Sequence, residues 1–114
     1  MKTKIRETLH VYIPVRRLIS CKKDIFLLPN KEYKLIIDYP LSKKAVFSIK
    51  TGKFGIGSNE LMGRIGTFYE WIYQEDARTD GEKFGIWGHE LSDLELGSIE
   101  INHKTKKIRL GIDS

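Results

Sequence analysis

The chain has 114 residues, of which 40% are apolar and 31% charged, a composition that excludes a disordered, collagen-like or coiled-coil protein and suits one globular domain over residues 1–114. The net charge of +5 is unevenly spread, because residues 1–54 carry 13 basic and 4 acidic side chains while residues 55–103 carry 3 basic and 10 acidic ones. A uniformly basic nucleic-acid-binding protein would not show this pattern, whereas a domain with two oppositely charged surfaces would.

The sequence also bears on the compartment. No apolar run approaches the ~20 residues that span a bilayer, and the basic start at residues 1–7 lacks the apolar stretch of a signal peptide. Cys21 is the only cysteine, which excludes an intrachain disulfide, and we expect it to be structural rather than catalytic. The sequence thus predicts a cytoplasmic protein that has no membrane partner.

The first half of the chain shows the patterns of four β-strands. Apolar and polar residues alternate from Leu9 to Val15, which is typical of a half-buried strand, and Pro14 places that strand at a sheet edge or at a bulge. The other three strands are predicted at residues 25–28, 33–39 and 45–50. The short turns between them favour antiparallel pairing.

The hydrophobic period then changes from that of a strand to that of a helix. Apolar residues recur at helical spacing at Leu61, Met62, Ile65, Phe68, Tyr69, Ile72 and Tyr73. They predict a helix over residues 58–75 with Ser58 as its N-cap. Gly66 borders the apolar arc and is expected to allow close packing on a strand. Gly63 lies on the polar side, where it costs about 1 kcal/mol relative to alanine and has no evident reason.

The last third of the chain completes the predicted fold. Residues 75–83 are polar and predict a solvated acidic loop, residues 84–95 match neither a helix nor a strand, and alternating apolar residues from Ile99 to Ile112 predict a hairpin around residues 103–106. The predicted fold class is α+β: an antiparallel sheet with four strands before the helix and two after it, and the one long helix packed on one face.

A glycine-rich turn between the fourth strand and the helix is the first candidate ligand site. Its candidate residues are Lys53, Gly55, Gly57 and Ser58. Backbone N–H groups of glycines at a helix start can approach a phosphate, and a lysine adds positive charge. Neither the Walker spacing nor the dinucleotide-binding spacing is present, so the alternative is a flexible strand-to-helix connection.

His89, Glu90 and Asp93 form the densest set of acid–base side chains and are the second candidate. His89 could act as a general base oriented by a carboxylate, but the local sequence places no serine or cysteine nucleophile beside it. The alternative is a structural turn in which Trp87 fills the core. We expect no metal site and no cofactor, since the three histidines are far apart in the sequence and the acidic loop lacks two ligands of a calcium loop.

Trp71 and Arg64 lie on one side of the predicted helix, away from the centre of its apolar face. An exposed tryptophan beside an arginine is typical of a protein-binding hot spot, and the alternative is that residues 77–95 cover Trp71. Nucleic-acid binding would require several basic residues and stacking aromatics on one surface. Tyr12, Tyr33 and Tyr39 are available for stacking, and the last two are expected in the core.

The leading functional hypothesis is a small non-catalytic protein-interaction module, such as an adaptor, an inhibitor or an immunity-type protein. It rests on the lack of a catalytic motif and on the segregated charge, which suits an electrostatically steered interface. Two alternatives stay open: a nucleic-acid-binding domain that uses the basic first half, and a small-ligand or phosphate-binding enzyme domain in which His89, Glu90 and Asp93 face the glycine-rich turn.

Overall fold

The computed structural model describes residues 5–18 and 26–114. The expectations for Cys21 and for the start of the strand at residue 25 lie outside these residues. The elements follow in the order β1 (Arg6–Pro14), η1 (Val15–Arg17), β2 (Phe26–Leu27), β3 (Glu32–Ile37), β4 (Ala45–Lys50), β5 (Ile56–Gly57), α1 (Ser58–Arg78), η2 (Leu91–Asp93), β6 (Glu95–Asn102) and β7 (Lys107–Asp113).

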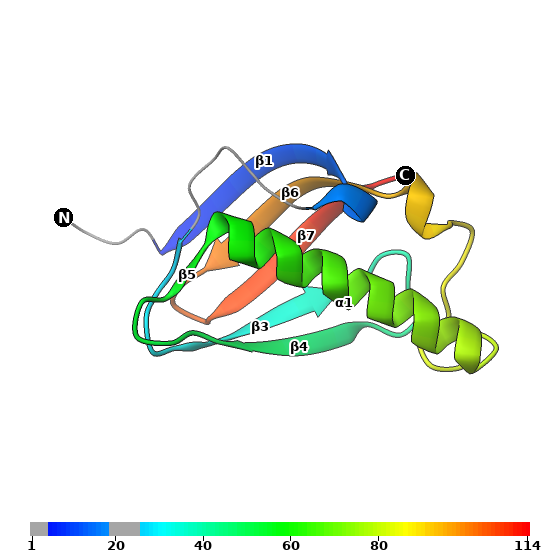
Figure 1. Cartoon of the computed structure of the whole chain (residues 1–114), viewed down its shortest axis with the longest axis horizontal. Helices are drawn as coiled ribbons and strands as arrows, with labels where there is room; N and C mark the ends of the chain where they lie inside the picture. The colour runs from blue at the N-terminus through cyan, green and yellow to red at the C-terminus, as the bar shows by residue number, and fades with distance from the viewer. Residues whose placement is uncertain (1–4, 19–25) are drawn as a thin grey trace.

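Five strands form one sheet in the order β1-β6-β7-β3-β4, and α1 packs across one face of it (Figure 1). Strands β2 and β5 form a separate two-stranded ribbon next to the start of the helix. The α+β class is confirmed, but the fully antiparallel sheet is wrong, because β3 pairs with β7 in parallel. Periodicity is the same for both pairing directions, so it could not reveal that the β6–β7 hairpin inserts between β1 and β3.

Strand β1 forms one edge of the sheet, and the prediction from Pro14 is confirmed. Its pairing with β6 shifts register between His10 and Ile13, and the bulge contains Tyr12 at a φ of 53°. Leu9 and Val11 are half-buried against the core. A bulge and a proline both hinder pairing with another strand, so this edge is protected.

The helix has the predicted apolar face, but it differs from the prediction at both ends. It runs to Arg78, beyond the predicted end at residue 75, and its N-cap is another residue. The predicted apolar residues are all buried or packed against the core. Pairing of β5 with β2 keeps the chain extended through Gly57, which is therefore the N-cap in place of Ser58. Gly66 packs against Val15 and Leu18 at η1 rather than against a strand. No helix in the described residues is long and apolar enough to cross a membrane.

A buried polar contact connects the β6–β7 hairpin to the core. His103 is buried, and its Nδ1 lies 2.8 Å from the hydroxyl of Tyr33. The same hydroxyl accepts a hydrogen bond from the backbone N–H of Leu28 at 3.2 Å, and burial raises the pKa of Tyr33. Since a protonated hydroxyl can donate to His103 while it accepts from Leu28, one atom satisfies two buried groups.

We expect Tyr33→Phe to lower the free energy of unfolding by about 2 kcal/mol, because Leu28 N–H and His103 Nδ1 both lose their partner in the core. Urea unfolding measures the change. Tyr73→Phe is the matched control, since the Tyr73 hydroxyl is only partly buried and donates to one carbonyl. Equal losses in the two variants would contradict the role of the Tyr33 hydroxyl.

Candidate functional site

Strand β4 forms the other edge of the sheet and, unlike β1, is unprotected. Its pairing with β3 is continuous from Lys50 to Ala45 without a bulge, and residues 45–49 contain no charge and no proline. Within residues 5–18 and 26–114, no strand pairs with the outer side of β4. Natural proteins usually block such an edge with charges, bulges or prolines, and in β4 only its last residue, Lys50, carries a charge.

Aromatic side chains line the helix side of this edge. Phe47 of β4 stacks on Phe68 of α1 with ring centroids 4.2 Å apart, and its edge meets Trp71 at 5.9 Å. Trp71 is 39% exposed. The loop after the helix covers a different part of the indole: Phe84 lies 5.7 Å away, and Lys83 Nζ lies 4.6 Å from the ring centroid. Both expectations for Trp71, cover by residues 77–95 and exposure, therefore hold in part.

A surface hollow of about 510 Å³ adjoins the aromatic residues on the same side of the helix. Its walls are Glu60, Arg64, Thr67 and Phe68, and Gly63 leaves one wall without a side chain. Arg64 forms an ion pair with Glu60 at 2.8 Å. We call the surface formed by Phe47, Gly63, Arg64, Thr67, Phe68 and Trp71 the β4 flank.

A buried carboxylate holds the loop that covers Trp71. Asp76, in the last turn of α1, is buried, and its Oδ1 accepts the backbone N–H groups of Phe84 and Gly85, both at 2.9 Å. Its Oδ2 accepts the N–H of Ile86 at 3.1 Å. The prediction of a solvated loop from residue 75 is thus wrong at Asp76, because the carboxylate satisfies three backbone donors that would otherwise be unpaired.

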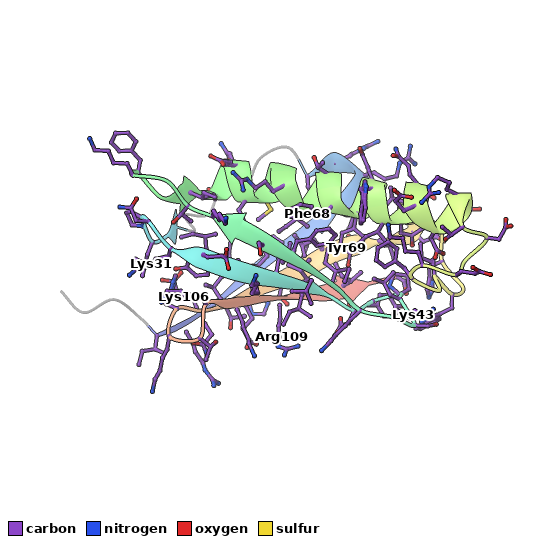
Figure 2. The ribbon with its side chains drawn as sticks, turned by 90° about the horizontal axis from the view of Figure 1, so that it is seen from below. Lys31, Lys43, Phe68, Tyr69, Lys106 and Arg109 are labelled. Carbon is purple, nitrogen blue, oxygen red and sulfur yellow. The ribbon has the colours of Figure 1, made fainter. Side chains whose placement is uncertain are left out.

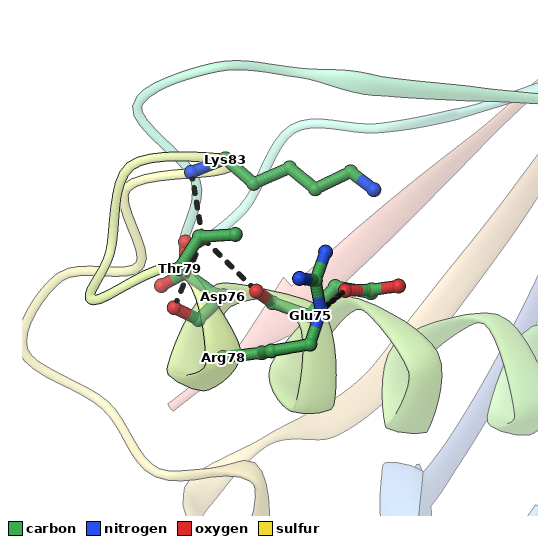
Figure 3. Close-up of polar contacts among 5 residues, drawn as sticks. All are labelled: Glu75, Asp76, Arg78, Thr79 and Lys83. Atoms are coloured by element: carbon green, nitrogen blue, oxygen red, sulfur yellow. Dashed lines mark hydrogen bonds and ion pairs between the residues drawn. The ribbon is translucent and has the colours of Figure 1, made fainter.

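Thr79 adds a second set of contacts at the same place (Figure 3). Its hydroxyl donates to the carbonyl of Glu75 at 3.0 Å and accepts from the N–H of Lys83 at 3.1 Å. Burial alone would raise the pKa of Asp76, but the three backbone N–H donors, with the charge of Lys43, hold it below its ordinary value. The carboxylate is therefore ionised at neutral pH, and Lys83 and Phe84 are fixed beside Trp71.

The second predicted group does not assemble an acid–base site. His89 Nε2 lies 2.9 Å from the hydroxyl of Tyr39 and 3.4 Å from that of Ser114. Glu90 and Asp93 instead cap η2, each side chain accepting the other residue's backbone N–H. His89 is thus bonded to hydroxyl groups, and the two neighbouring carboxylates have a structural task.

Trp87 does not fill the core. It is 49% exposed and lies edge-on to Tyr39 with ring centroids 5.3 Å apart. Its backbone N–H bonds to the carbonyl of Pro40, which holds the segment against the β3–β4 loop. Gly85 and Gly88 on either side of this tryptophan both have positive φ.

The glycine-rich turn lies at the other end of the molecule. Gly57 and Ser58 do start the helix, but Lys53 lies over the exposed ring of Phe54, and the N–H of Gly55 bonds to the carbonyl of Gly52. Figure 1 shows this turn at the N-terminal end of α1, whereas η2 lies beside the C-terminal half of the helix, next to η1. The turn and the His89 group therefore do not face each other, as the alternative of a small-ligand or phosphate-binding enzyme domain required.

Comparison of the chain with protein-family models, with curated proteins and with solved structures found no match. Among the described residues, no group of three or more His, Cys, Asp or Glu side chains could hold a metal ion. Of the predicted site residues, Arg64 and Trp71 lie on one continuous surface. Phe47 and the open edge of β4 were missed, because only the order of strands in the sheet reveals them.

We expect Asp76→Asn to lower the free energy of unfolding by about 3 kcal/mol at pH 7, since an amide cannot accept all three N–H groups and has no charge. The folded pKa of Asp76 lies below its unfolded value of about 3.9. Its contribution is therefore complete above that pH and is lost as the pH falls through the lowered pKa. Urea unfolding at pH 7 and at lower pH should show the difference between the two proteins narrowing below about pH 4.

Asp80→Asn is the matched control for this substitution, because Asp80 is exposed on the same loop. We expect a change of at most about 0.5 kcal/mol. Similar losses in the two variants, or a difference for Asp76→Asn that stays constant with falling pH, would contradict the anchoring role of the buried carboxylate.

We expect Gly63→Ala to raise the free energy of unfolding by about 1 kcal/mol, because alanine favours a helix and the added methyl group would meet nothing within 4 Å. Thermal and urea unfolding measure the gain. A loss of stability would show that the free protein itself needs glycine in the hollow.

Proposed function

We propose that the protein is a small non-catalytic interaction module of the cytoplasm, acting as an adaptor, an inhibitor or an immunity-type protein. In this proposal an extended segment of a partner protein pairs with β4 and rests its side chains on the β4 flank. The open edge of β4 beside the exposed part of Trp71 is the observation that carries the proposal.

Strand addition explains why backbone and side chains are exposed together. An added strand gains main-chain hydrogen bonds along the edge, and every second side chain then points towards the helix. Those side chains would meet Phe47, Phe68 and Trp71, and the hollow at Gly63 has space for one more. Exposed tryptophan and arginine side chains are common where binding energy is concentrated, and Trp71 and Arg64 are both present.

The charges around β4 indicate what kind of segment would bind. Lys44 and Lys50 are exposed at the two ends of the strand, and the residues between them are uncharged. Complementary charges steer association and fix register. The partner segment is therefore apolar in its middle and acidic at its ends.

Selection from a displayed library of random twelve-residue peptides tests this proposal without a known partner. We expect the selected peptides to alternate apolar residues and to protect β4 amides from hydrogen exchange. Val46→Lys should weaken binding by about tenfold or more, since Val46 is 52% exposed and a lysine on an edge strand hinders pairing. Trp71→Ala should have an effect of similar size.

Trp87→Ala is the matched control, because Trp87 is similarly exposed but contacts Tyr39 and Pro40 rather than the β4 flank. The proposal fails if bound peptides leave the β4 amides unprotected, or if the two tryptophan variants lose equal affinity. Sedimentation tests whether the edge binds a second copy of this chain. A wild-type protein that is a dimer and a Val46→Lys variant that is a monomer would show this, and would contradict a separate partner.

A further inference from the structure

The sheet face opposite α1 is a second open surface, separate from the β4 flank. In Figure 2, Phe68 and Tyr69 lie between the helix and the sheet, whereas Arg109 projects from the other side of the sheet. We call this side the open face. Exposed residues alternate with more buried ones along β7 and in the first half of β3, so the pleat fixes which side chains face solvent there.

Positive charges gather on the open face towards the β6–β7 hairpin. Lys34 and Lys107 are direct neighbours in the parallel β3–β7 pair, and Arg109 is two residues further along β7. Arg6 pairs in register with Asn102, which in turn pairs with Lys107. Acidic residues lie among them: Lys34 forms an ion pair with Glu32 at 3.1 Å, and Arg109 pairs in register with Glu100. None of the ion pairs among the described residues includes Arg6 or Lys107. Like charges side by side on a sheet are unfavourable, which an anionic ligand would reverse.

A hollow of about 180 Å³ lies on the same face beyond Arg109. It is lined by His10, Tyr12, Gly97, Ser98, Gly111 and Asp113. The two glycines leave room for side chains of the neighbouring strand, because a methyl group at Gly111 would lie 2.3 Å from Ser98 Oγ, and one at Gly97 would lie 2.9 Å from Asp113 Oδ2. Glycine inside a strand often marks a place where a ligand approaches the backbone.

Tyr12 forms the aromatic wall of the hollow. It is 64% exposed, and its ring lies nearly parallel to that of His10, with a centroid distance of 6.3 Å and an angle of 16°. The bulge in β1 gives Tyr12 its positive φ. A tyrosine in this strained conformation, with its ring in solvent, is unfavourable for the protein alone. Stacking of a planar ligand on the ring would bury it and offset this cost.

We propose that the open face binds single-stranded nucleic acid, with one base in the hollow against Tyr12 and the phosphates along Arg109, Lys107 and Lys34. Stacking platforms combined with basic tracks are the general solution for single strands. Asp113 decides which part of the ligand enters the hollow, since a carboxylate repels phosphate but accepts hydrogen bonds from the exocyclic amino groups of adenine, cytosine or guanine. Uracil has no such group and should bind least well.

Fluorescence anisotropy with labelled ten-nucleotide oligomers of A, C and U, at 50 and 200 mM salt, tests the proposal. We expect the A and C oligomers to bind more tightly than U, and Tyr12→Asn to weaken binding by about tenfold. Asparagine tolerates positive φ, so the substitution removes the ring and keeps the bulge. Arg109→Gln should reduce the slope of log affinity against log salt by about 0.7, the value for one phosphate contact of a single strand.

Arg78→Gln is the matched control, because it removes the same charge from the helix layer. It should leave both affinity and slope close to wild type. The proposal is overturned if no oligomer binds at 50 mM salt, if Tyr12→Asn and Arg109→Gln behave like Arg78→Gln, or if heparin binds and the base identity and Tyr12 have no effect. These measurements need no peptide ligand, so their result is independent of binding at β4.

Discussion

The apolar side of α1 packs on one face of a five-stranded sheet, and a single helix cannot cover the other face or both edges as well. The core is therefore built from helix residues that recur at about 3.6-residue spacing and from strand residues that recur at every second position. The uncovered parts of the sheet are the open face and its two edges, of which the edge at β4 lacks the bulge and the proline that protect β1. Both candidate interaction surfaces thus arise from the same packing, which is also what stabilises the fold.

Local patterns predicted most of the elements. The alternation in β1 and the helical spacing from Leu61 to Tyr73 were sufficient, because burial of one side imposes a period on each element. The predictions that were wrong concern features that depend on contacts between residues far apart in the chain. The parallel β3–β7 pair, the packing of Gly66 on η1 and the cap at Gly57 in place of Ser58 each involve a partner far away in the chain.

The candidate site was predictable to a similar extent. Helical spacing placed Trp71 and Arg64 on one side of α1, where the structure also has them. Spacing could not show that Phe47 would lie against Phe68, since that requires β4 to be the strand beneath this side of the helix. Nor could it show that the acidic Asp76 would be buried, because its three backbone partners lie eight to ten residues further along the chain.

The contacts of Asp76 have a consequence for the cost of association. A recognition surface made of free loops loses conformational entropy when it binds, which subtracts from affinity. Here the segment beside Trp71 is already immobilised by a carboxylate in the same helix that carries the indole. The surface is thus preorganised, so that a ligand proposed to bind there would not have to order the receptor first.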